Sequence, residues 1–136
     1  MKQVQLVSPE FIHSIWDTIK PFFDASLDAS NDDYSVDQMK MLLVNGSQHL
    51  LVAVEDNKIS GIMTAEIINY PNNRVMHITA LGGSAIVNKE TFDQVESWAK
   101  SQGATKIRAF AKDVQARLYR LKIGLNTVTH VVEKNI

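Results

Sequence analysis

The segment HLLVAVEDNKISGIMTAEIINY, residues 49–70, restricts the fold more than any other part of the chain. Two runs rich in apolar and β-branched residues flank Asp56 and Asn57, and turn residues of this kind between two strands are typical of a tight hairpin. A second turn at 71–73 leads into RVMHITAL, residues 74–81. We therefore expect three consecutive antiparallel strands in the middle of the chain.

The N-terminal part predicts a short strand followed by a helix. The strand covers residues 2–8. Ser8 caps the helix, Pro9 occupies its first turn, and Pro21 should end or kink it. Apolar residues at helical spacing predict one core-facing side, made of Phe11, Ile12, Ile15, Trp16 and Ile19. Residues 24–33 have no apolar period and predict an acidic loop.

A second helix follows this loop. Ser35 and Gln38 form a capping box at its start, and Gly46 ends it. The apolar residues of this helix are Val36, Met39, Leu42 and Leu43.

The last third predicts alternating helices and strands. A helix over 89–103 should bury Phe92, Val95, Trp98 and Ala99, and a strand over 105–111 follows. Asp113 then caps a helix with one apolar side, formed by Val114, Leu118 and Leu121. The run TVTHVVE, residues 127–133, predicts a final strand.

The order of elements is β-α-α-β-β-β-α-β-α-β, an α/β (α+β) arrangement. Hairpin-linked strands in the middle and β-α-β units near the end imply a mixed, mostly antiparallel sheet with helices on both faces. Ligands of such sheets bind beyond the carboxyl ends of the strands, near a topological switch.

Composition narrows the class of protein. The 136 residues form one predicted domain, 1–136, with 45% apolar residues and no cysteine, which excludes disulfides and thiolate metal sites. The four histidines show no metal-ligand spacing, so no metal site is predicted. The N-terminus lacks a signal-peptide pattern and no apolar run has the ~20 residues of a membrane helix. We expect a cytoplasmic protein with no membrane partner.

Charge is unevenly distributed along the chain. Residues 1–99 carry 6 Lys and Arg against 13 Asp and Glu, whereas residues 100–136 carry 8 against 2. The basic last third suits an anionic ligand or nucleic acid, although solvated surface charge explains it too. Nucleic acid ranks lowest as a partner, because only Phe110 and Tyr119 could stack on bases there.

The stretch ALGGSAIVNKETF, residues 80–92, places two glycines between a strand and a helix. Unpaired backbone N–H groups at such a junction can hold a phosphate. The alternative is a turn that merely contains glycines. No Gly-Lys-Ser/Thr follows, so this is not a Walker loop.

The element order and several short strings resemble the GNAT acetyltransferase superfamily. The strings are NYPNNRVMHI, the GG that follows, WAKSQGATKIRAF and RLKIGL. More narrowly, the chain is similar to short GNAT-like proteins encoded by phages and prophages. The resemblance implies acetyl-CoA as co-substrate and an amine acceptor that enters from the opposite side. Acetyl-CoA would bind along the fourth strand and the next loop, at Ile78, Thr79, Ala80, Leu81, Gly82, Gly83, Ser84 and Ala85, with Arg117 adding attraction for its phosphates.

Two positions depart from the family pattern. Gly83 and Ala85 match the family's loop motif, but Ala80 stands where the family has Gln or Arg. The family also carries a tyrosine acid four residues before a Gly-aromatic pair, a pair that Gly124 and Leu125 match here. Tyr119 is one position off that spacing. Either the helix end carries an extra residue, or Tyr119 is a packing residue.

Glu66 is the candidate general base, with His77 on the neighbouring strand. The alternative for both is a polar residue on the open face of a half-buried sheet. The leading hypothesis is an N-acetyltransferase that moves acetyl from acetyl-CoA to a primary amine, with Tyr119 as acid. The alternative is a non-catalytic phage protein that acts in virion assembly or binds a virion or host protein. A homodimer and a virion location remain open.

Overall fold

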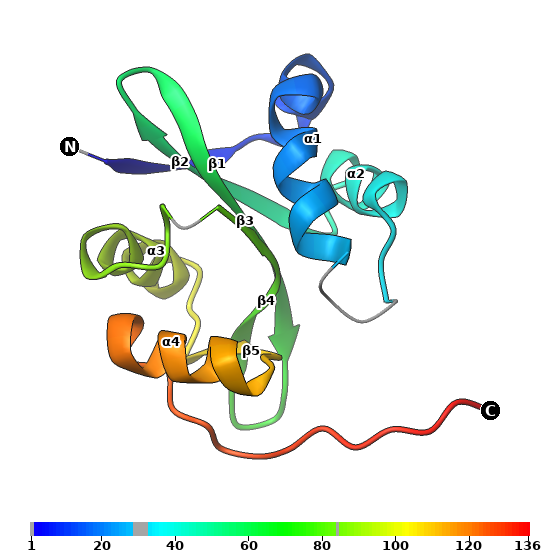
Figure 1. The fold of residues 1–136 in the computed structure, drawn as a ribbon, viewed down its shortest axis with the longest axis vertical. Coiled ribbons are helices and arrows are strands. Elements are labelled where there is room, and N and C mark those ends of the chain that lie inside the picture. The colour runs from blue at the N-terminus through cyan, green and yellow to red at the C-terminus, as the bar shows by residue number, and fades with distance from the viewer. Residues whose placement is uncertain (1, 29–32, 84) are drawn as a thin grey trace.

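The computed structural model describes residues 2–28, 33–83 and 85–136. The elements follow the predicted order up to the last helix (Figure 1). They are β1 (Gln3–Val7), the 3₁₀ turn η1 (Pro9–Phe11), α1 (Ile12–Asp28), α2 (Val36–Val44), β2 (His49–Glu55), β3 (Lys58–Asn69), β4 (Arg74–Gly82), α3 (Lys89–Ser101), β5 (Lys106–Ala109) and α4 (Asp113–Ile123).

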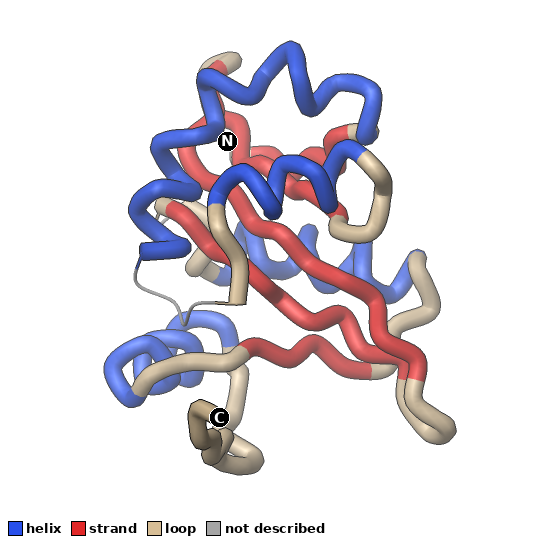
Figure 2. The backbone as a smooth tube through the Cα atoms, turned by 90° about the vertical axis from the view of Figure 1, so that its right-hand side faces the viewer, coloured by secondary structure: helices blue, strands red, loops and turns tan. Residues whose placement is uncertain are grey.

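The five strands form one sheet in the order β1-β2-β3-β4-β5 (Figure 2). The pairs up to β3–β4 are antiparallel, and β4–β5 is parallel. Asp56 and Asn57 join β2 to β3 with φ values of 52° and 62°, the left-handed conformation that a tight hairpin turn requires. The predicted hairpin and its extension by β4 are therefore confirmed.

Helices cover both faces of the sheet, as predicted (Figure 1). On one face α1 and α2 bury Ile19, Phe23 and Met39 against Leu50 and Ile62 of the strands. On the other face α3 packs on a separate cluster. Its buried members include Phe92, Val95 and Ala99 of the helix and Leu51, Met63 and Met76 of the sheet.

Helix α1 continues through Pro21 and ends at Asp28, so Pro21 does not end the helix and the predicted start of the loop at residue 24 is wrong. Proline removes one backbone hydrogen bond. The buried stripe on both sides of Pro21, which includes Trp16 and Leu27, offsets that loss. Phe11 lies in the 3₁₀ turn before α1 and is exposed, so it is not the core residue that we predicted.

The last third differs most from prediction. β5 has only four residues, and α4 exposes the side that we expected to be buried: Val114 and Leu121 are 81% and 73% exposed, and Leu118 is 40% exposed. Residues 127–133 form no strand and run as an extended trace (Figure 1). A β-branched run becomes a strand only where a partner edge accepts its hydrogen bonds, and in this arrangement the segment lies outside the sheet.

Candidate functional site

One edge of β4 is open over its last residues. Pairing with β5 ends at Ile78 and Ala109, whereas pairing with β3 continues to Gly82. The backbone of 79–82 therefore has a strand on one side only, within the part of the chain that the structure describes. Free N–H and C=O groups on such an edge can bind an extended, amide-containing ligand as an added strand would.

A hollow of about 270 Å³ lies between this end of β4 and α4. Leu81, Gly83 and Val87 form one wall, and Tyr119 of α4 contributes to the other. The remaining lining residues, also on α4, are Gln115, Leu118 and Lys122. The walls are largely apolar with polar groups at one side, which suits a narrow chain that carries amides and ends in an anionic group.

The end of α4 is a left-handed glycine cap. The N–H group of Gly124 donates to the carbonyl oxygen of Tyr119, and Gly124 has a φ of 76°, a common way for a helix to end. Tyr119 lines the hollow, whereas Arg120 is exposed.

Burial raises the pKa of Tyr119 above its ordinary value of 10.0. The phenol therefore carries its proton throughout the neutral range. A protonated phenol can donate to a developing thiolate, which is the chemistry of a general acid.

Gly82 at the end of β4 and Gly83 directly after it lie close to the backbone of other segments. A Cβ on Gly82 would lie 2.7 Å from the carbonyl oxygen of Phe22, and one on Gly83 would lie 2.8 Å from that of Ser60. Gly83 also has a φ of +75°. Both glycines are therefore required for the close approach of α1 and β3. Ser84, a predicted cofactor-binding residue, lies outside the described residues.

Helix α3 begins at Lys89, and the Asn88 side chain caps it by accepting from the N–H of Thr91 at 3.0 Å. The start is six positions beyond Gly83, so the helix N-terminus does not follow the glycines directly. Ala85 and the two residues after it fold inward and are buried. Because the helix begins at Lys89, the amide groups of this loop are less accessible to a phosphate than they would be if the helix began near Ser84.

Among the remaining predicted cofactor residues, Leu81 and Gly83 line the hollow, and Arg117 is exposed on another side of α4. Gln115 and Lys122 also line the hollow, although we did not predict them as site residues. They lie four and three residues from Tyr119, and residues so spaced share a helix face, which was the available signal.

Glu66 lies on the sheet face that α1 and α2 cover, directly opposite His77 across the β3–β4 pair. Its carboxylate oxygen Oε2 accepts from Gln48 Nε2 at 3.4 Å. The Gln48 amide oxygen accepts from the Thr79 hydroxyl at 2.7 Å, and Thr79 contacts the hydroxyl of Thr64 at 2.8 Å. These residues form a polar cluster at the middle of β3 and β4.

Burial governs the protonation of two more groups beside Glu66. The pKa of His77 is lowered mainly by burial and also by Arg108, with Glu66 acting in the opposite direction. The pKa of Tyr34 is raised by burial and by the negative charges of Glu66 and Asp33, with the Gln48 side chain opposing. His77 is thus neutral near pH 7.

The polar cluster and the hollow meet at β4. Thr79 belongs to the cluster and Leu81 lines the hollow, and two residues along a strand correspond to ~7 Å. The β3–β4 register shifts between Thr64 and Ala65, which places an irregularity in β4 at Thr79. The carboxylate of Glu66 therefore lies on one side of β4, and the protonated phenol of Tyr119 lies on the other.

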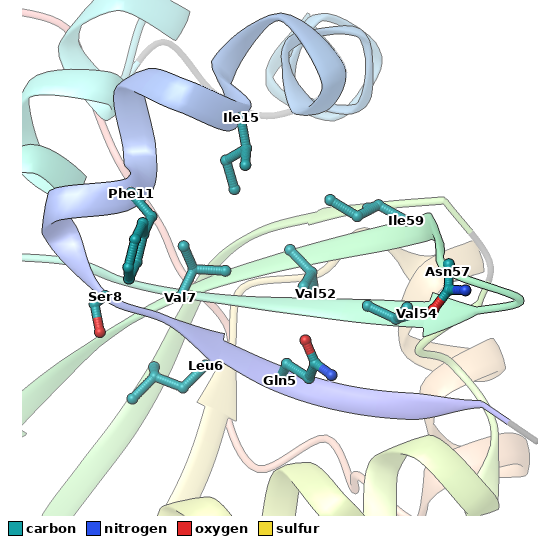
Figure 3. Close-up of a pocket in the computed structure, with 10 residues that line it drawn as sticks. All are labelled: Gln5, Leu6, Val7, Ser8, Phe11, Ile15, Val52, Val54, Asn57 and Ile59. Carbon is teal, nitrogen blue, oxygen red and sulfur yellow. The ribbon is translucent and has the colours of Figure 1, made fainter.

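A larger hollow, about 430 Å³, lies over β1–β3 beneath the start of α1 (Figure 3). Its lining is mostly apolar, with Val7, Val52 and Ile59 pointing into it, and includes no titratable side chain. It holds none of the predicted site residues. Without an acid or base, this hollow offers burial and no proton-transfer chemistry.

The described ranges hold no group of three or more metal-ligating side chains and no helix long and apolar enough to cross a membrane. The predicted acidic loop is partly helical: Asp24 and Asp28 belong to α1, and Asp24 pairs with Lys20 at 3.2 Å. Asp32 lies outside the described residues.

Comparison with solved structures identifies the fold. A predicted acetyltransferase with acetyl-CoA from Clostridium acetobutylicum has a TM-score of 0.65 at 16% identity, over 99% of this chain and 96% of that one. The fold is that of the GNAT acetyltransferases. A ribosomal-protein-alanine N-acetyltransferase from Brucella melitensis biovar Abortus 2308 has a TM-score of 0.68 at 13% identity, over 100% of this chain and 98% of that one.

A third structure, an aminoglycoside acetyltransferase from an uncultured soil metagenomic sample, has a TM-score of 0.68 at 14% identity, over 99% of this chain and 97% of that one. No protein-family model and no curated protein matches the sequence. The predicted GNAT-like fold is thus confirmed at the level of architecture. The closer likeness to short phage-encoded proteins stays a prediction.

Proposed function

We propose that this protein is an N-acetyltransferase that transfers acetyl from acetyl-CoA to a primary amine. The observation that carries the proposal is the position of Tyr119, whose protonated phenol lines the hollow beside the open edge of β4. The solved structures with this fold support it, since one contains acetyl-CoA and all three are described as acetyltransferases.

The residues of the hollow fit the thioester arm of acetyl-CoA. The unpaired edge over 79–82 would bind the amides of the arm, and Leu81 and Val87 would contact its apolar parts. The positive charge of Lys122, which lines the hollow, would attract a phosphate further along acetyl-CoA. The volume of about 270 Å³ admits a narrow chain, so the nucleotide would lie on the surface, nearer Gly83.

Glu66 would receive the proton of the amine on the opposite side of β4, directly or through a water molecule. The amine nitrogen then forms its bond to the acetyl carbon while the carbon–sulfur bond breaks. Tyr119 would donate its proton to the departing sulfur and regain one from solvent. No covalent bond to the protein is needed, so alignment of the two reactants would supply most of the acceleration.

Binding and transfer can be tested separately. We expect calorimetric titration with acetyl-CoA to give heat of binding that weakens with salt. Lys122→Glu should weaken binding, whereas Lys134→Glu, on the exposed C-terminal segment, is the matched charge control. Thiol release from acetyl-CoA should then be followed with three amine probes: spermidine, a peptide with N-terminal alanine, and sisomicin.

Tyr119→Phe should leave acetyl-CoA affinity nearly unchanged and slow transfer ~10²-fold or more, as loss of a general acid does. Absence of binding at millimolar acetyl-CoA would refute the proposal and favour a non-catalytic, partner-binding role for this fold. Binding without transfer to any of the three probes would refute the catalytic part alone.

A further inference from the structure

Gln48 is a deeply buried residue beside the proposed base. The residue is 3% exposed, and its backbone N–H donates to the carbonyl oxygen of Leu42 at 3.1 Å. The residue therefore sits at a fixed position between the end of α2 and the start of β2. A buried amide that far from water needs partners for both its donor and its acceptor.

The hydrogen bonds around Gln48 run in one direction. The Thr79 hydroxyl donates its only proton to Gln48 Oε1, so in its 2.8 Å contact with Thr64 it must accept. Thr64 thus donates to Thr79, Thr79 donates to Gln48, and Gln48 Nε2 donates to Glu66 Oε2. Thr64, at the start of this chain, is fully buried.

The Glu66 carboxylate determines how the amide of Gln48 is turned. A flipped amide would place its oxygen against this carboxylate, where both groups only accept, whereas the Thr79 hydroxyl could accept from the amide nitrogen and donate to Thr64 instead. Gln48 is therefore held with its donor toward Glu66, and the Thr79 hydroxyl donates to its amide oxygen.

The two oxygens of Glu66 are consequently unequal. Oε2 is held by Gln48, while Oε1 has no hydrogen-bond donor among the residues that the structure describes. A carboxylate held at one oxygen is restricted in rotation, and its other oxygen is available to a new donor.

We propose that Gln48 is a positioning residue that holds Oε2 of Glu66 and presents Oε1 to the incoming amine. This inference rests on the proposed acetyl transfer and deepens it. The Thr64–Thr79 pair acts one step further back, by holding the amide oxygen of Gln48. A purely structural glutamine would fill the same space without affecting the orientation of the base.

The experiment compares the steady-state kinetics of two variants. Gln48→Leu removes the proposed positioning residue, and Gln102→Leu, the matched control, replaces an exposed glutamine at the C-terminal end of α3. Spermidine, the alanine peptide or sisomicin serves as acceptor, whichever the wild-type protein acetylates. We expect Gln48→Leu to lower kcat ~10–100-fold, a range typical of residues that orient a reacting group. KM for acetyl-CoA should change less than twofold, and Gln102→Leu should behave as wild type.

Thr79 variants provide a second route if Gln48→Leu does not fold. Thr79→Val removes the donor to Gln48 and should lower kcat, whereas Thr79→Ser keeps the hydroxyl and should restore most of it. Circular dichroism checks that each variant is folded. Equal rates for Thr79→Val and Thr79→Ser would overturn the orientation chain.

A double-mutant cycle gives the most direct result. If Gln48 acts through Glu66, Gln48→Leu should have almost no further effect on kcat in a Glu66→Gln background. Independent, additive losses would overturn the inference while leaving acetyl transfer intact. A wild-type protein that binds acetyl-CoA but acetylates none of the probes would overturn the proposed function and this role together.

Discussion

Helices α1 and α4 both have apolar residues at helical spacing, but the apolar side of α1 is buried and that of α4 is exposed. Phe23 of α1 is 0% exposed, whereas Leu121 of α4 is 73% exposed. Both helices place apolar residues on one side, but only α1 has a sheet face and a second helix against that side. Periodicity thus indicates that a helix has an apolar side, and its neighbours decide whether that side is buried.

The proposed site lies where these two regions meet. Its β4 wall belongs to the well-packed sheet, and its α4 wall belongs to the exposed third. Changes in the first region should therefore affect stability, and changes in the second should mainly affect binding.

The largest contrast should come from the two tryptophans. Trp16, 6% exposed, stacks on Phe23 with ring centroids 5.4 Å apart, so Trp16→Ala should lower the free energy of unfolding by ~3–5 kcal/mol. Trp98 is only half-buried, and we expect a smaller loss for Trp98→Ala. Urea denaturation measures both. We predicted that both tryptophans are largely buried, and Trp98 is the more exposed of the two.

Trp98→Phe provides a control for that comparison. The indole Nε1 of Trp98 is buried without a hydrogen-bond partner in the described part of the chain. Removing an unsatisfied donor offsets part of the lost contact. A loss for Trp98→Phe as large as that for Trp98→Ala would contradict this explanation.

Two glycines with nearly equal φ values allow the same comparison between the sheet region and the C-terminal third. Gly83 and Gly124 have φ values of +75° and +76°, but only Gly83 has atoms near its missing Cβ. Alanine costs ~1–2 kcal/mol at either position because of the left-handed conformation. Gly83→Ala should cost ~1–3 kcal/mol more, because the new Cβ overlaps Ser60. Equal midpoints in urea would show that the loop after β4 adjusts freely.

Acidification should weaken the sheet region through two histidines. Burial lowers the pKa of His49 and of His77 below the ordinary 6.5. Their neutral forms therefore stabilise the folded state above pH ~6.5, and this contribution is lost as pH falls through the folded-state pKa.

We expect the free energy of unfolding to fall with decreasing pH by at most ~1.4 kcal/mol per pH unit for each histidine. The variant His49→Gln/His77→Gln should show a shallower slope between pH 7 and 5. An unchanged slope would mean that other groups cause the acid sensitivity.

The smallest effect is expected from removing residues 126–136. Val132 in this segment is 90% exposed, and exposed residues contribute within ~0.5 kcal/mol. The thermal midpoint of the shortened chain should match that of the full chain. A large loss would show that 127–133 pairs as a strand after all, on β5 or on a second copy, which size-exclusion chromatography with light scattering would distinguish.

Local sequence chemistry determined the elements of this protein up to the last helix. The Asp56-Asn57 turn, the Ser35–Gln38 capping box and the apolar periods of α1 and α3 each act over a few residues. Such signals need no knowledge of the rest of the chain. They sufficed for the sheet order through β4 and for helices on both faces.

Only the tertiary structure decided which side chains meet. Glu66 and Gln48 are separated by 18 residues, and their contact depends on the β2–β3 register and on the α2 end. The roles of Gly82 and Gly83, the side of α4 that faces β4, and the unpaired 127–133 segment depend likewise on distant neighbours. The physical reason is that burial and hydrogen bonding between distant segments are set by packing, which local propensity does not encode.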